Sequence, residues 1–128
     1  MARKDSLIYK QLGVSLATSF NSTPTIVRNL DNCSYQINVT TTDSVGTFAL
    51  QGSNDYSTTA QSPNNGGNTA GTWVTLPIGG TPSVSAANDQ IMIDINQFPF
   101  EALRIAYTSS TAGTGTCNII LVARQLGG

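Results

Sequence analysis

The sequence predicts an all-β fold, an antiparallel β-sandwich or jelly roll of about eight short strands with an N-terminal arm. Two observations carry this prediction. Apolar and polar residues alternate along several short segments, which is the pattern of half-buried strands. Charged residues make up only 10% of the chain. Thr, Ser, Asn and Gly take their place, and these residues favour strands and turns over helix interiors.

The first residues of the chain do not follow the alternation. We therefore expect an N-terminal arm over 1–11, with a short helix at 6–11, ahead of a single β-sandwich domain over 12–128. The arm combines basic and apolar side chains, which favours contact with a neighbouring subunit, whereas the alternative is a frayed chain end. The residues expected to make this assembly contact are Arg3, Lys4, Leu7, Ile8, Tyr9 and Lys10.

The alternation is clearest in three segments, 33–41, 90–96 and 102–108, each with an apolar face and a polar face. Segment 117–124 is apolar on both faces, which predicts a strand that is central or covered on both sides. Weaker patterns predict further strands at 12–20, 24–30, 45–51 and 72–76.

A long polar segment, 53–71, interrupts the strand pattern. Irregular segments of this length usually carry a function, so we expect an exposed binding loop. Its side chains offer amides, a carboxylate and one aromatic ring to a ligand. The residues expected to bind are Asn54, Asp55, Tyr56, Asn64 and Asn65.

The residues needed for catalysis are missing from the sequence. The chain has no histidine, which removes the commonest general base and the commonest transition-metal ligand. Several of its acidic residues fall at turn positions, where they ordinarily cap the backbone. We therefore expect no enzyme activity, no cofactor and no metal. Cys33 and Cys117 are expected to be buried free thiols, with a bridge between them as the alternative.

Charge is unevenly distributed along the chain, although the net charge is only −1. Residues 1–28 are basic, whereas 29–103 contain acidic residues and neither Lys nor Arg. This distribution predicts neither nucleic acid nor a membrane as a partner. It favours a basic arm that docks onto the acidic body of a neighbouring copy, with a solvated tail as the alternative. The N-terminus lacks a secretory signal pattern, so we expect synthesis in a cytoplasm.

Four segments read FALQGSND (48–55), WVTL (73–76), DINQFPFEALRIAY (94–107) and TGTCNIILVAR (114–124). Together they resemble small β-sandwich structural proteins of tailed bacteriophages. The resemblance implies a virion component, such as a head decoration protein or a neck or tail subunit. It implies copies of the chain itself and other virion proteins as partners, and a virion location after synthesis in the host cytoplasm.

The same segments also resemble, more weakly, discoidin-like carbohydrate-binding modules. That resemblance implies a carbohydrate- or receptor-binding module with a weak glycan contact. The chain departs from the pattern, because Tyr56 follows Asp55 where the modules usually have Gly and a polar insertion separates Asp55 from Trp73. We expect Trp73 in the sandwich core, with an exposed ring that stacks on a sugar as the alternative.

Overall fold

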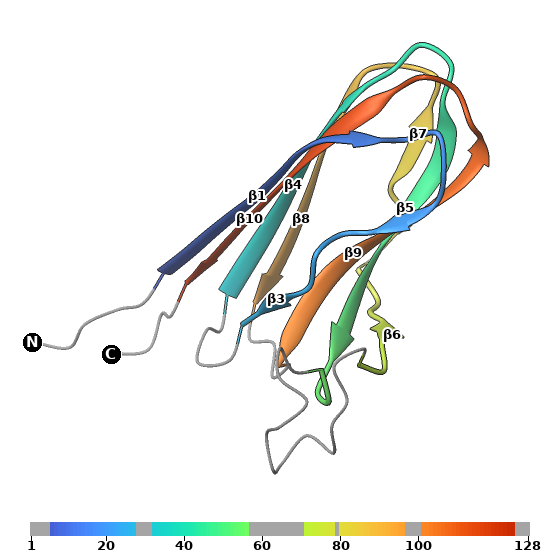
Figure 1. Cartoon of the computed structure of the whole chain (residues 1–128). Coiled ribbons are helices and arrows are strands. Elements are labelled where there is room, and N and C mark those ends of the chain that lie inside the picture. The colour runs from blue at the N-terminus through green and yellow to red at the C-terminus, as the bar shows by residue number, and fades with distance from the viewer. Residues whose placement is uncertain (1–5, 28–31, 57–70, 79, 97–100, 125–128) are drawn as a thin grey trace, which may run out of the picture.

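The computed structural model describes residues 6–27, 32–56, 71–78, 80–96 and 101–124, which form ten strands in two antiparallel sheets (Figure 1). All-β architecture is therefore confirmed. The strands are β1 (Ser6–Ser15), β2 (Phe20–Asn21), β3 (Thr25–Ile26), β4 (Asn32–Thr40), β5 (Val45–Ser53), β6 (Val74–Thr75), β7 (Ser83–Ser85), β8 (Asp89–Asn96), β9 (Ala102–Thr111) and β10 (Thr116–Arg124).

The strand order is that of a jelly roll. Sheet A has the order β1-β10-β4-β8. Sheet B has β9 and β5 at its centre, with β2 and β3 along the outer edge of β9 and β6 and β7 along the outer edge of β5. If each pair of short strands counts as one interrupted strand, the chain crosses between two four-stranded sheets, as in a double-sheet jelly roll.

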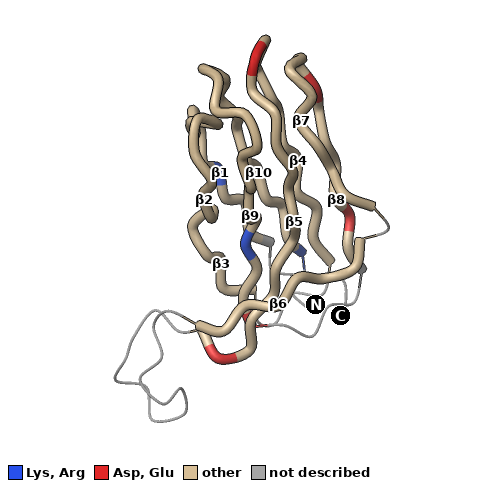
Figure 2. The backbone as a smooth tube through the Cα atoms, turned by 90° about the vertical axis from the view of Figure 1, so that its right-hand side faces the viewer, with Lys and Arg blue, Asp and Glu red and all other residues tan. Residues whose placement is uncertain are grey.

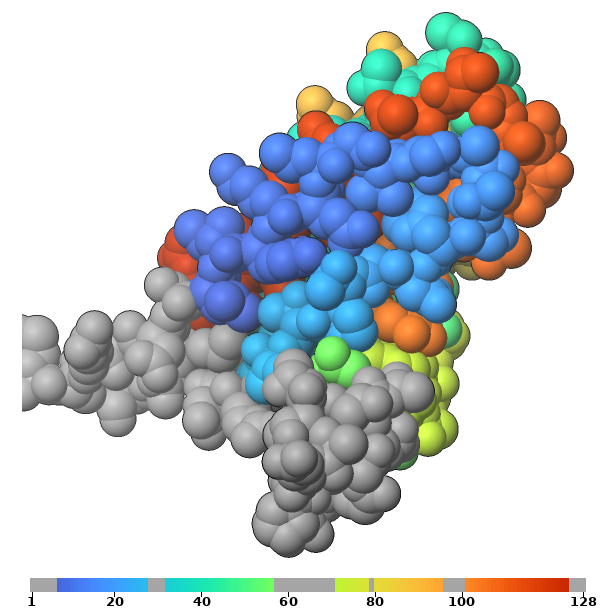
Figure 3. Space-filling model, in the orientation of Figure 1, coloured from blue at the N-terminus to red at the C-terminus, as the bar shows by residue number. Residues whose placement is uncertain are grey.

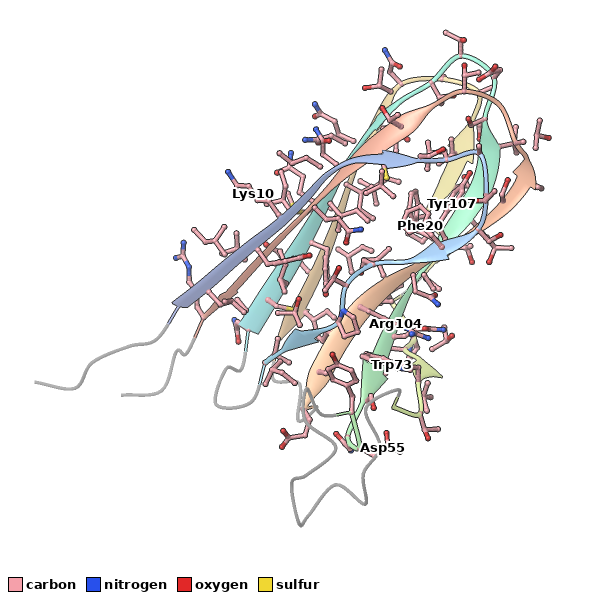
Figure 4. The ribbon with its side chains drawn as sticks, in the orientation of Figure 1. Lys10, Phe20, Asp55, Trp73, Arg104 and Tyr107 are labelled. Atoms are coloured by element: carbon pink, nitrogen blue, oxygen red, sulfur yellow. The ribbon has the colours of Figure 1, made fainter. Side chains whose placement is uncertain are left out.

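The core is one apolar layer between the sheets. The inward residues of β4 and β10 pack against those of β5 and β9, and along β4 and β10 the alternate residues point outward. Phe20, Phe48 and Tyr107 form an aromatic cluster, in which the ring centroid of Phe20 lies 5.4 Å and that of Phe48 lies 4.8 Å from the centroid of Tyr107. Phe20 and Tyr107 are labelled in Figure 4. The largest fully buried side chains are Tyr35, Tyr107, Phe48, Leu16, Ile37, Leu50, Leu103, Ile105, Ile119 and Leu121.

The expected helix at 6–11 is wrong, because these residues lie in β1. The strand pairs with β10 from Ser6–Arg124 to Gln11–Ile119, and a bulge at Gly13 separates this stretch from a second short one. Leu7 and Tyr9 pack against the core while Ile8 and Lys10 are exposed, so the segment does alternate. The alternation was not recognised in the sequence because it spans only a few residues and is interrupted by charged side chains. The structure thus places 6–11 within the sandwich, and 1–5 lie outside the described residues.

The long predicted strands are found within a few residues of their expected bounds. They are β4, β5, β8, β9 and β10, and β10 lies between β1 and β4, in the central position that its two apolar faces predicted. The strands predicted from weaker patterns differ more from the structure. Segment 12–20 divides between β1 and β2, and 24–30 and 72–76 each yield only a two-residue strand in the described part of the chain.

The two cysteines are free and buried, as the sequence favoured. On adjacent strands β4 and β10, Cys33 lies opposite Ala123 and Cys117 lies opposite Val39. The thiols are therefore six register positions apart. This corresponds to about 20 Å along the strands, far beyond the reach of a disulfide. Burial raises the pKa of Cys33 to about 12, helped by the nearby charge of Asp94, and raises that of Cys117 to about 11.

The close contact between β5 and Tyr107 gives a prediction about stability. A methyl group at Gly46 would overlap the Tyr107 ring and the Thr108 carbonyl oxygen, whereas one at Gly80 would meet nothing. We expect Gly46→Ala to lower the free energy of unfolding by roughly 1–3 kcal/mol, because a packed core cannot absorb the added volume. Urea unfolding measures it, with Gly80→Ala as the matched control. Equal stabilities of the two variants would contradict the packing.

Candidate functional site

An arginine–aromatic cluster lies on the outer face of sheet B (Figure 4). Arg104 of β9 holds its guanidinium carbon 4.3 Å from the ring centroid of Trp73. Its Nε donates a hydrogen bond of 2.8 Å to Oε1 of Gln51, which lies opposite Arg104 on β5. The Tyr56 ring stands 5.6 Å from that of Trp73, tilted by 47°. We call Tyr56, Trp73, Arg104 and Gln51 the arginine–aromatic cluster.

The structure corrects the expected place of Trp73. Its side chain is half-buried and outside the hydrophobic core. The reason is the register of β6, in which Gln51 lies opposite Thr75 and Gly52 lies opposite Val74. Leu76, three residues after Trp73, packs against the core where Trp73 was expected to pack. Trp73 instead lies under the cation of Arg104, an arrangement that stabilises both side chains.

Asp55 connects the two ends of the segment 57–70. Its Oδ1 accepts hydrogen bonds from the Thr72 backbone N–H at 2.7 Å and from the Ser53 hydroxyl at 2.8 Å. The Ser53 hydroxyl oxygen in turn accepts one from the Tyr56 N–H at 3.2 Å. These bonds favour the ionised carboxyl, and the bond from Thr72 contributes most to lowering the Asp55 pKa to about 2. Asp55 therefore closes the base of the segment.

The cluster offers limited room for a ligand. One face of Trp73 is covered by Arg104, so the open ring face needed for sugar stacking is not available on that side. Of the five residues expected to form a binding loop, Asp55 and Tyr56 are half-buried in the loop base, and Asn54 is exposed. Asn54 accepts a hydrogen bond from the Glu101 N–H at 3.3 Å. Asn64 and Asn65 lie outside the described residues.

The residues expected to form the assembly arm occupy both sides of β1. Leu7 and Tyr9 face the core, whereas Ile8 and Lys10 face outward, with Ile8 64% exposed. The residues of β1, β2 and β3 cover the edge of the sandwich that faces the viewer in Figure 3. Lys10 extends away from the body of the molecule in Figure 4. Arg3 and Lys4 lie outside the described residues.

The sequence analysis did not assign Arg104 or Gln51 to a site. Arg104 and Gln51 stood in recognised strands, but only their cross-strand register brings them to Trp73. Within the described segments, no three His, Cys, Asp or Glu side chains gather in a way that could hold a metal ion. In the same segments there is no helix long and apolar enough to cross a membrane.

Comparison with solved structures finds likenesses of fold. The crystal structure of the SPBc2 prophage-derived protein YomS matches with a TM-score of 0.52 and 11% sequence identity, covering 95% of this chain and 96% of that one. A structure of Bacillus endospore appendages, which form disulfide-linked pili, matches with a TM-score of 0.47 and 20% identity, covering 95% and 85% of the two chains. No protein-family model and no curated protein matches the chain. At 11% identity the likeness to YomS shows the fold alone.

The role of Asp55 gives a prediction about pH dependence. Because its pKa is about 2 in the folded chain, below the ordinary 3.8, its contribution to stability is present above about pH 4 and is lost as the pH falls towards 2. We expect Asp55→Asn to be less stable than the parent at pH 7, and the difference to shrink between pH 4 and pH 2. Urea unfolding across this range measures it. A difference that does not change with pH would contradict the assignment.

Proposed function

We propose that this chain is a non-catalytic structural protein of a bacteriophage virion, which assembles through repeated contacts with copies of itself and with other virion proteins. The observation that carries the proposal is the jelly roll whose sheet A has long outer strands with exposed apolar side chains. Ile8 and Leu12 of β1 are each 64% exposed, and Met92 of β8 is 62% exposed. Exposed apolar side chains on a small domain favour contact with a partner. The fold likeness to a prophage-derived protein supports the same role.

The outer face of sheet A is suited to repeated protein contacts. Its central strands present uncharged side chains, namely Ser34, Gln36 and Asn38 of β4 beside Ile120 and Val122 of β10. Uncharged polar groups lose less free energy than charges when an interface removes them from water. Many such contacts, each weak and repeated by symmetry, hold a shell, ring or tube together.

Within the virion, head decoration and neck or tail subunit are the positions that we propose. The partners are other virion proteins rather than nucleic acid or a membrane, because the residues between 29 and 103 include no Lys or Arg. The location is the virion after synthesis in the host cytoplasm. Basic residues at 1–5 would then meet the acidic body of a neighbouring copy.

A carbohydrate- or receptor-binding module is the second candidate function. The observation that favours it is the cluster of Tyr56, Trp73 and Arg104 on the outer face of sheet B, next to a long polar segment. Such a cluster would bind a glycan weakly, through the exposed part of the Trp73 ring and the remaining donors of Arg104.

Sedimentation of the native source material separates the two candidates. We expect the chain to co-sediment with intact particles in a density gradient, at many copies per particle by quantitative peptide mass spectrometry. A chain that stays in the soluble fraction as a monomer would overturn the structural role. Quenching of Trp73 fluorescence by glycans, absent in an Arg104→Ala variant, would then support the second candidate.

Removal of residues 2–5 tests the contribution of the basic N-terminus. This deletion removes Arg3 and Lys4 but keeps β1 whole, so the folded domain should remain intact. We expect weaker assembly, and the loss should be largest at low ionic strength, where charge attraction is strongest. Light scattering follows assembly, and circular dichroism checks the fold. Unchanged assembly of the deletion variant would refute the role of this segment.

A further inference from the structure

Sheet A ends in two long strands whose outer edges are open. Among the described residues, β1 pairs only with β10 and β8 pairs only with β4, so each has one unpaired edge. Alternate residues along such an edge direct backbone N–H and C=O groups outward, and these groups can pair with another strand. Sheet B differs, because its outer positions are taken by the short strands β2, β3, β6 and β7.

The edge of β8 carries Asp89 and Asp94 but lacks the other features that usually protect an edge strand. It pairs with β4 over eight consecutive residues without a bulge, and its sequence, DQIMIDIN, contains no Lys and no Pro. Met92, Ile93 and Asp94 line an open cavity of about 320 Å³, and Ile78 and residues 80–82 form its other wall, so a partner strand would enter between them and β8.

The directions of the strands fit a contact between copies. Each of the three steps from β1 through β10 and β4 to β8 is antiparallel, so β8 runs opposite to β1. A second copy placed beside the first in the same orientation therefore brings its β1 antiparallel to β8. The two A sheets then join into one continuous sheet (Figure 2 shows β1 and β8 on opposite sides of the molecule).

The side chains at the two edges are complementary. On β1, the exposed Lys10 lies between the exposed Ile8 and Leu12. On β8, the exposed residues include Met92 and Asp94. An antiparallel register that places Lys10 opposite Asp94 also places Leu12 opposite Met92, so that a salt bridge and an apolar pair form side by side.

Pairing of like edges would lose this complementarity. Two β1 edges would bring Lys10 near the Lys10 of the partner copy, and two β8 edges would gather Asp89 and Asp94 from both copies. Like charges across an interface disfavour it, whereas opposite charges select the partner and its orientation. The charges therefore favour an unlike pair of edges over either two-fold arrangement.

We propose that copies of this chain assemble head to tail by pairing β1 of one copy with β8 of the next, with Lys10 opposite Asp94 and Leu12 opposite Met92. The proposal rests on the assembly role proposed above and names the contact that builds the assembly. Because the two surfaces differ, the contact repeats from copy to copy and generates a ring where the rotation closes, or a filament where it does not.

Engineered cysteines test the contact directly. Leu12 and Met92 of one chain are three strand spacings apart, about 14 Å, so a disulfide between these positions must join two copies. We expect a mixture of the Leu12→Cys and Met92→Cys variants to form a covalent dimer under mild oxidation. The Leu12→Cys/Met92→Cys double variant should form a ladder of oligomers. The native thiols are buried and do not compete.

Val74→Cys is the matched control, since Val74 is 61% exposed but lies on sheet B. A mixture of Val74→Cys and Met92→Cys should form no covalent dimer above the level of random collision. Equal crosslinking in the two mixtures would overturn the edge contact. Preferential crosslinking of Met92→Cys to itself would overturn it too, in favour of a two-fold contact.

Charge reversal provides an independent test by sedimentation equilibrium. We expect Lys10→Asp and Asp94→Lys each to weaken self-association roughly tenfold or more, because each opposes like charges. The double variant should regain most of the loss. If the parent assembles and the single variants assemble equally well, the edge contact is wrong while the assembly role stands. If the parent is monomeric in solution and absent from particles, both proposals fail.

Discussion

The whole fold depends on one apolar layer that two sheets must share. The register of β4 with β10 runs unbroken from Asn32–Arg124 to Thr40–Thr116. Slippage by one residue would turn Gln36 and Asn38 of β4 into the core and expose Tyr35 and Ile37, at a cost far greater than any edge contact could recover. With β4 and β10 at the centre of sheet A, β1 and β8 are its outermost strands. The open edges of β1 and β8 are therefore consequences of how the core is packed.

The long strands can be predicted from the sequence because each carries its own pattern of apolar and polar residues. The short strands cannot, because they depend on a neighbouring strand that is distant in sequence. Alternation over seven or more residues identified β4, β8 and β9, and apolar residues on both faces identified β10. In contrast, β2, β3 and β6 are two residues long and exist only because β9 or β5 offers an edge. Trp73 shows the same limit at the candidate site. Its size suggested burial, but it lies on the surface under Arg104, which is distant in sequence and is itself hydrogen-bonded to Gln51.

Asp55 and Asp43 hold turns together at opposite ends of the sandwich. Opposite the Asp55 end, Asp43 accepts a hydrogen bond of 2.9 Å from the Thr114 N–H, and Ser44 accepts one of 3.0 Å from the Gly115 N–H. These bonds join the β4–β5 turn to the β9–β10 turn. A side chain at Gly113 or Gly115 would collide with this clamp. The sequence predicted the capping roles of the acids from their turn positions, but not the partners across the sandwich.

The two sheets differ in how their outer edges are protected, and this difference is related to the small number of charged residues in the chain. A small soluble domain ordinarily protects its sheet edges with charged residues, prolines or short strands. Sheet B follows this rule through its short outer strands, whereas sheet A leaves two long edges with one outward cation on β1 and acidic residues on β8. Edges of the same charge would repel neighbouring copies, and uncharged edges would pair in any orientation. Opposite charges on the two edges favour one orientation, in which β1 of one copy meets β8 of the next. In the proposed assembly a few charges are therefore enough to select the orientation, whereas many charges at these edges would oppose the contact.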